Sequence, residues 1–101
     1  MTLHELIQRI GYFRNEKKLS ARELSLRIEK SGTYINQIES GNFMLSLPML
    51  LKIIDALDIS CAEFFAENYT NYKQDKEIIN LLSNLSADRK NSFIDLMKNT
   101  K

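Results

Sequence analysis

The stretch that decides the fold runs from Lys17 to Asn42 and reads KKLSARELSLRIEKSGTYINQIESGN. Ser20 is followed three residues later by Glu23, the pattern of a capping box, and this predicts that a short helix begins there. Ser31 is predicted to cap a second short helix, which Gly41 ends in a left-handed turn. The very short connection between these helices forces their axes to cross steeply.

A steep crossing of two short helices is the geometry of a helix-turn-helix, and the residue types suit it. Small Ser25 can lie where the axes cross. The apolar residues predicted to pack beneath the crossing are Leu24, Ile28, Ile35 and Ile38. Any two short packed helices can share this pattern, so the geometry alone leaves DNA binding open.

Caps and apolar spacing predict three further helices within residues 1–66, which leaves no room for a sheet. The first follows the capping box of Thr2 and Glu5, and its apolar face comprises Leu3, Leu6, Ile7, Ile10 and Phe13. Ser46 caps another, with Pro48 in its first turn. Its apolar face, expected to be buried, comprises Leu47, Leu50, Leu51, Ile54 and Leu57. Ser60 begins the fifth helix.

The remainder of the chain differs in character. Residues 67–74 are polar and aperiodic and are predicted to be a linker, and residues 75–101 are predicted to form a helical pair. One helix carries the stripe Ile78, Leu81, Leu82 and Leu85; the other, capped by Ser86, carries Phe93, Ile94 and Met97. Two short helices with one apolar stripe each cannot stabilise themselves, so they must dock on the first domain or on a second chain.

Composition indicates a soluble helical protein. The 101 residues are 44% hydrophobic, with three Gly and one Pro. The net charge of +1 gives no indication of an anionic partner, but residues 1–45 hold seven Lys or Arg against five acids, whereas residues 46–70 hold one against four. An anionic partner should therefore meet the first half. A single Cys and the absence of an apolar run of roughly 20 residues favour a cytoplasmic protein that does not enter a membrane.

The sequence offers no constellation for catalysis. His4 is the only histidine, and it is far in sequence from Cys61, which is expected to be buried as a small hydrophobic residue. No Cys or His spacing suggests a metal site, and no glycine-rich phosphate loop occurs. We therefore expect no enzyme activity, no cofactor, no metal and no small-molecule ligand.

Three segments together resemble one family. KKLSARELSLRI, SGTYINQIESGN and LPMLLKIIDALDISCAEFF are similar, without a gap from Ile7 to Phe65, to the phage-repressor or Cro-type (XRE-like) helix-turn-helix regulators. The resemblance implies an all-α, five-helix lambda-repressor-like domain over residues 1–66 that binds operator DNA. It also implies a homodimer on a palindromic site, with the helix beginning at Ser31 in the major groove.

The family's base-reading positions fall on four residues of this chain, namely Gly32, Thr33, Asn36 and Gln37. Gln and Asn can pair with the N6/N7 edge of adenine, and Thr can meet the thymine methyl group. Gly32 would permit close backbone approach, and Tyr34 would offer its hydroxyl to a phosphate. The full set of predicted DNA-binding residues is Arg22, Lys30, Ser31, Gly32, Thr33, Tyr34, Asn36, Gln37 and Asn42.

Three departures from the family pattern keep other functions open. Ala21 replaces the Gln that commonly braces the reading helix, and Glu29 replaces the turn Gly, so it should adopt left-handed backbone at a cost of about 1 kcal/mol. The loop Phe43–Leu45 is apolar instead of basic; it is expected to fold onto the core, the alternative being an exposed apolar patch for a partner. Glu39 is expected to pair with a nearby Arg. The alternatives are a protein-interaction module on the same scaffold, or an antitoxin or restriction–modification controller.

Overall fold

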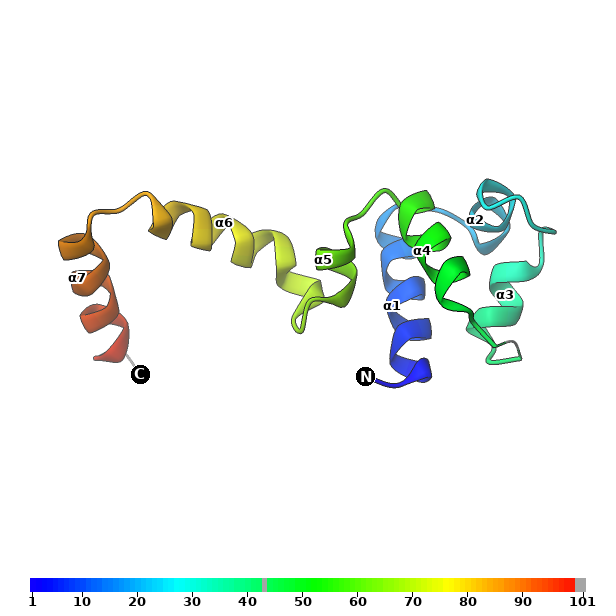
Figure 1. Cartoon of the computed structure of the whole chain (residues 1–101), viewed down its shortest axis with the longest axis horizontal. Helices are drawn as coiled ribbons and strands as arrows, with labels where there is room; N and C mark the ends of the chain where they lie inside the picture. The colour runs from blue at the N-terminus through cyan, green and yellow to red at the C-terminus, as the bar shows by residue number, and fades with distance from the viewer. Residues whose placement is uncertain (43, 100–101) are drawn as a thin grey trace. The chain divides into compact units, whose positions relative to one another are not determined.

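The computed structural model describes residues 1–42 and 44–99, and within them the regular structure is entirely helical (Figure 1). The elements are α1 (Leu3–Glu16), α2 (Ala21–Arg27), α3 (Tyr34–Glu39), α4 (Leu47–Ala56), α5 (Cys61–Phe65), the 3-10 helix η1 (Tyr69–Asn71), α6 (Tyr72–Ser83) and α7 (Ala87–Lys98). The chain divides into two compact units, Met1–Ala66 and Glu67–Lys101. The predicted class, a five-helix domain followed by a helical pair, is confirmed.

Hydroxyl caps begin most of these helices as the sequence predicts. The side-chain oxygens of five residues accept hydrogen bonds from the backbone N–H three residues on: Thr2, Ser20, Ser46, Ser60 and Ser86. At Ser20 the box is reciprocal, because the Glu23 carboxylate accepts from the Ser20 N–H at 3.2 Å. These bonds satisfy backbone donors that the first turn of a helix would otherwise leave unpaired.

The predicted cap at Ser31 is wrong. Helix α3 begins at Tyr34, and its N-cap residue is Thr33, which makes no side-chain capping bond. Ser31 lies in the preceding turn, where its carbonyl accepts from the Tyr34 N–H at 3.1 Å and its hydroxyl lies 3.4 Å from that of Thr33. The backbone closes a turn before it enters the helix, so α3 begins two residues later, about half a helical turn, than the sequence suggests.

The core of the first unit forms where α3 packs on α1 and α2, and where α2 and α5 pack on α4 (Figure 1). Of the residues described in this unit, seven apolar side chains are completely buried: Ile10, Leu24, Ile28, Ile35, Ile38, Ile53 and Phe64. Phe13 of α1 contacts Phe64 of α5, with ring centroids 5.8 Å apart. The four residues predicted beneath the helix crossing are therefore all in the core, where their burial stabilises the crossing.

The predicted apolar face of α4 is only partly correct. Leu50, Ile54 and Leu57 are buried, but Leu47 is 64% exposed and Leu51 is 45% exposed. The buried stripe instead includes Ile53, because helical periodicity places residues 50, 53, 54 and 57 on one face and turns residues 47 and 51 towards its edge.

Two other burial predictions are wrong. Met44 does not fold onto the core, since 89% of its surface is exposed; Leu45 is half-buried, and Phe43 lies outside the described residues. Cys61 is exposed because it is the first residue of α5, a five-residue helix whose buried residue is Phe64.

A buried arginine closes the other end of α5. Arg9 is 8% exposed, and its Nη1 donates to the carbonyl oxygens of Phe64 and Ala66, each at 2.7 Å. These carbonyls lie at the C-terminal end of α5, where a cation is electrostatically favoured. The guanidinium therefore ties α1 to the end of the first unit. Charge-assisted hydrogen bonds offset the cost of removing it from water.

Among residues 1–42 and 44–99, three non-glycine residues follow helix ends with positive φ: Lys18 at 56°, Glu29 at 61° and Asp58 at 56°. The left-handed conformation expected of Glu29 is confirmed. It allows the N–H of Glu29 to reach the Leu26 carbonyl at 3.0 Å and that of Lys30 to reach the Ser25 carbonyl at 3.0 Å. These bonds close α2 and turn the chain towards α3.

Glu29→Gly is expected to be more stable than Glu29→Ala by about 0.5–1 kcal/mol in chemical unfolding, because glycine enters the left-handed region without a Cβ clash. Both variants lose the same contact, an exposed ion pair in which Lys52 Nζ lies 3.8 Å from Glu29 Oε2. The difference in unfolding free energy between the two variants therefore measures the backbone strain at position 29. An alanine variant as stable as the glycine variant would show that the turn carries no strain.

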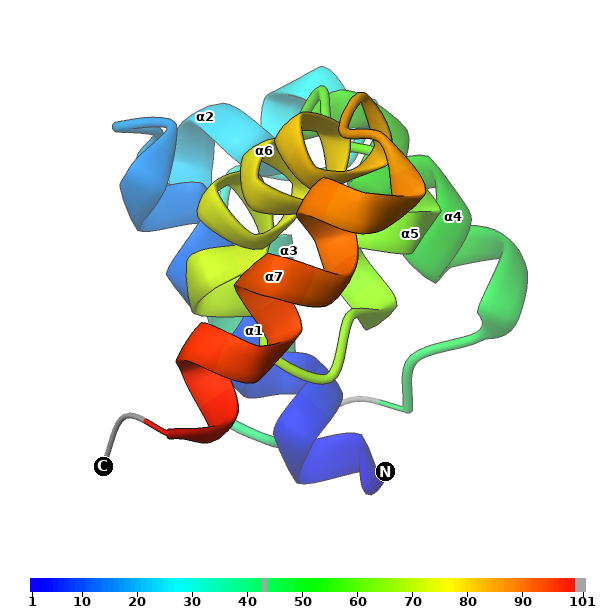
Figure 2. The same ribbon diagram turned by 90° about the vertical axis from the view of Figure 1, so that its left-hand side faces the viewer.

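The second unit comprises η1, α6 and α7, and none of these described helices contains a buried residue. Helix α6 begins at Tyr72 directly after η1, so much of the segment predicted to be a linker is helical. A short turn connects α6 to α7 (Figure 2). Across the described part of the chain, no helix combines the length and apolar character needed to cross a membrane.

Candidate nucleic-acid interface

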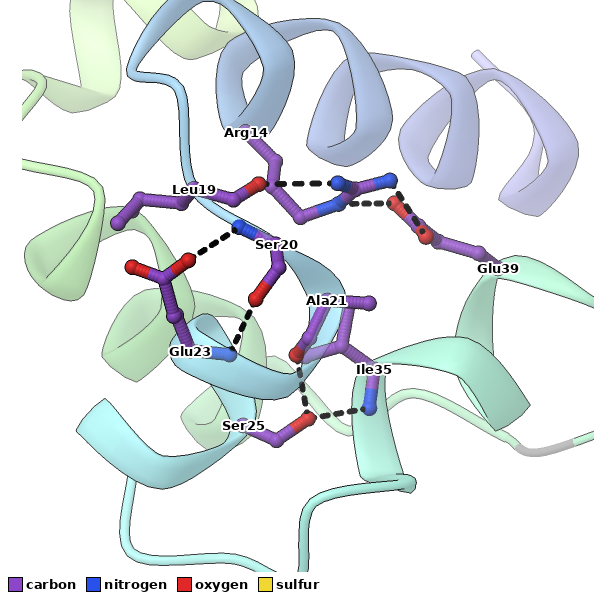
Figure 3. A network of polar contacts seen from close by, with 8 residues as sticks. All are labelled: Arg14, Leu19, Ser20, Ala21, Glu23, Ser25, Ile35 and Glu39. Carbon is purple, nitrogen blue, oxygen red and sulfur yellow. Dashed lines mark hydrogen bonds and ion pairs between the residues drawn. The ribbon is translucent and has the colours of Figure 1, made fainter.

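A buried serine fixes the crossing of α2 and α3. Ser25 is fully buried; its Oγ donates to the Ala21 carbonyl at 2.7 Å and accepts from the Ile35 N–H at 2.9 Å (Figure 3). One hydroxyl thus satisfies a carbonyl of α2 and a backbone donor in the first turn of α3. A larger side chain would separate the helices, and a side chain without the hydroxyl would leave the Ile35 N–H unpaired.

Ser25→Ala is expected to lower the free energy of unfolding by about 1–3 kcal/mol, because it leaves a buried backbone donor without an acceptor. Ser40→Ala is the matched control. The Ser40 hydroxyl also donates to a backbone carbonyl, that of Gln37 at 2.8 Å, but the bond is exposed and joins no two helices. The control should change stability by less than about 0.5 kcal/mol in the same denaturant titration. If both substitutions lowered the free energy of unfolding equally, the Ser25 hydroxyl would not hold the helix crossing.

A second polar link fixes the far end of α3. Arg14 of α1 donates from Nε and Nη2 to the two Glu39 carboxylate oxygens, at 3.0 and 3.1 Å (Figure 3). Its Nη1 also donates to the Leu19 carbonyl at 3.0 Å. Both side chains are less than one-fifth exposed, so water screens this bidentate pair less than a surface pair.

The partner of Glu39 is thus an arginine, as predicted, although the sequence did not identify Arg14 as that residue. The available signal was its spacing, because Arg14 follows Ile7 and Ile10 at helical intervals on the buried face of α1. Gly11 leaves room for this pair: a Cβ at Gly11 would lie 3.3 Å from Glu39 Oε1.

These links turn one polar face of α3 outwards. Ile35 and Ile38 are buried, whereas Thr33 and Asn36 are exposed and Gln37 is half-buried. Residues 33, 36 and 37 share a side of the helix because their spacing follows the helical repeat. The structure therefore brings together the neutral donors and acceptors that the sequence assigns to base reading.

The turn before α3 collects most of the remaining predicted residues. Lys30 places its Nζ 5.4 Å from the centroid of the half-buried Tyr34 ring, a cation–π contact. Ser31 is exposed in this turn, and the side chain of Arg22 lies against Gly32.

Asn42 lies at the opposite end of α3 from these residues. It follows Gly41, whose φ of +82° ends the helix, and its N–H donates to the Gln37 carbonyl at 3.1 Å. Its exposed side chain is available to a partner there, but it is separate from the cluster in the turn.

The crossed helix pair with its outward-facing polar helix agrees with the family comparison, which shows a helix-turn-helix DNA-binding transcription regulator of the XRE type. The helix-turn-helix family model (HTH_3) matches residues 10–64, more than half of the chain, and the chain belongs to this family. The matched region spans α2 and α3 and the helices that hold them.

One similar solved structure is described as the SinR protein/SinI protein complex. The aligned sequences are 25% identical, and the match covers 92% of this chain and 94% of that one, with a TM-score of 0.53. No curated protein shows significant sequence similarity to the chain.

Proposed function

We propose that the protein is a sequence-specific repressor that inserts α3 into the major groove of double-stranded operator DNA. The observation that carries the proposal is the outward face of α3, where Thr33, Asn36 and Gln37 project away from buried Ile35 and Ile38. Membership of the helix-turn-helix family supports the docking geometry, in which the second helix of the motif enters the groove.

The proposed contacts follow from the chemistry of each side chain. The Asn36 and Gln37 amides can each pair bidentately with adenine, and Thr33 can contact the thymine methyl group. Around them, Arg22, Lys30 and the Tyr34 hydroxyl would contact phosphates, which orient the protein without reading sequence. Bound at a promoter, the protein would exclude RNA polymerase.

Selection from a random pool of double-stranded DNA tests this function directly. We expect the pool to converge on two half-sites containing A·T pairs and related by a two-fold axis. Their centres should lie about one DNA turn, roughly 34 Å, apart. If no sequence is enriched even at low salt, the proposal of specific DNA binding is wrong, and the scaffold serves protein interaction instead.

Gln37→Ala is expected to weaken binding to the selected site by about 1–3 kcal/mol and to relax preference at one base pair, because one bidentate contact is lost. Gln8→Ala is the matched control. Gln8 is exposed on α1, outside the proposed interface, so its loss should leave affinity and preference unchanged. Fluorescence anisotropy with the selected site and its single-base variants measures both effects. An unaltered preference in the Gln37 variant would contradict its base-reading role.

We also propose that the second unit forms a homodimer interface. Its helices expose seven large apolar side chains, 39% to 63% each: Ile78, Ile79, Leu81, Phe93, Ile94, Leu96 and Met97. Such a surface favours coverage by another chain. The similar solved structure is of a protein–protein complex, which supports a protein partner. We assign a second copy because two linked reading helices match a palindromic operator.

Leu81→Lys is expected to shift the protein from dimer towards monomer in sedimentation equilibrium, because it places a charge in the proposed apolar interface. Leu81 is 63% exposed in the single chain, so the change should not disturb the first unit. Asn80→Lys adds the same charge at the adjacent exposed position and should preserve the dimer. A dimer that tolerates both changes equally would show that the interface lies elsewhere.

A further inference from the structure

We propose that Gly32 acts on DNA binding through Arg22: the missing side chain at position 32 lets Arg22 lie across the turn before α3 and present its guanidinium to a DNA phosphate. Arg22 is therefore a phosphate-binding residue, and Gly32 is its positioning residue. The inference rests on the proposed DNA-binding function and assigns a different role to Gly32 from the close backbone approach predicted from the sequence.

The contact between the two residues is direct. A Cβ at Gly32 would meet Arg22 Nη1 and would lie 3.2 Å from both Cγ and Cζ of the same side chain. Atoms of both the stem and the guanidinium of Arg22 thus occupy the space that a side chain at position 32 would need. Any other residue would push Arg22 away from this path.

The backbone gives no reason for a glycine at this position. Of the glycines in the described residues, only Gly41 has positive φ, and a Cβ there would meet nothing within 4 Å. Gly32 is the reverse case, because its backbone suits any residue but the space above it is filled. The glycine at position 32 therefore leaves room for the side chain of Arg22.

Arg22 itself has unused binding capacity. It is exposed, and within the described parts of the chain it makes no hydrogen bond or ion pair. Its guanidinium carries five N–H donors in a planar fork, which matches the oxygens of a phosphate. Its side chain already lies across Gly32, so the proposed phosphate contact would need little rearrangement of Arg22.

The position of Arg22 in the motif favours a phosphate over a base. It is the second residue of α2, and in helix-turn-helix complexes the first helix of the motif crosses the DNA backbone while the second enters the groove. Helix α3 supplies no cation of its own, since residues 31–51 contain neither Lys nor Arg. A cation held over the turn before α3 would supply the charge that this helix lacks.

The test is a double-mutant cycle with wild type, Gly32→Ala, Arg22→Ala and the double variant, measured on the selected site over a range of salt concentrations. Arg22→Ala should weaken binding about tenfold on all sequences and reduce the log–log salt slope by about one per bound protomer. Gly32→Ala should weaken binding several-fold in the presence of Arg22. In the Arg22→Ala background it should have no further effect.

Two controls separate positioning from structural damage. None of the three variants should unfold at a lower temperature than the wild type, because neither residue contributes to the core. Arg22→Lys should restore the salt slope but only part of the affinity, since an ammonium keeps the charge and lacks the planar fork.

Each adverse result has a distinct meaning. If Gly32→Ala weakens binding equally with and without Arg22, Gly32 serves backbone approach and the positioning role is wrong. If Arg22→Ala relaxes one base pair and leaves the salt slope intact, Arg22 reads a base and the phosphate assignment is wrong. If the wild type enriches no site, the proposed function fails first and takes this inference with it.

Discussion

The arrangement of the first unit depends on the close crossing of α2 and α3, which the Ser25 hydroxyl holds at a single point. Because that hydroxyl joins backbone to backbone, it constrains the direction of both helices. The Arg14–Glu39 pair then fixes the other end of α3 on α1. Two polar attachments, one at each end of a six-residue helix, give α3 an orientation that its own length could not secure.

The arginines that hold the first unit together differ from the arginine at the proposed interface in whether they have a partner within the protein. Inside the unit, Arg14 and Arg9 have protein partners for their guanidinium groups, so they hold structure. At the surface, Arg22 lies against Gly32 and has no such partner among the described residues. Buried arginines thus hold the scaffold together, whereas the exposed Arg22 remains available to bind a ligand.

Much of the fold was predictable from local rules. Hydroxyl caps and helical spacing identify the helices, and Glu29 could be assigned a strained turn from its register in the motif. The failures occur where local signals compete with longer-range geometry. Ser31 resembles a cap, but the chain needs a turn there to reach α3; Cys61 and Leu47 are apolar, but their helices present other residues to the core.

The sequence named the residues of the candidate interface, which stay a prediction, but it did not specify their contacts with the rest of the unit. The positions on α3 follow from register, whereas the identity of the arginine that pairs with Glu39 depends on how α1 approaches α3. The contact of Arg22 with Gly32 likewise joins α2 to a turn whose backbone path no sequence rule specifies. Contacts between separate elements depend on how those elements pack against each other, which a local sequence pattern does not specify.

The absence of Lys and Arg from α3 has a consequence for how such a protein responds to its surroundings. Neutral amide and hydroxyl contacts release no counterions, so ionic strength would act on the flanking cations and leave the base contacts almost untouched. Under the proposed mode of binding, salt would alter how long the protein stays on any DNA, while its ranking of one sequence over another would hold. The fraction of DNA sites that the protein occupies would then vary with salt, while its preference for one sequence over another would not.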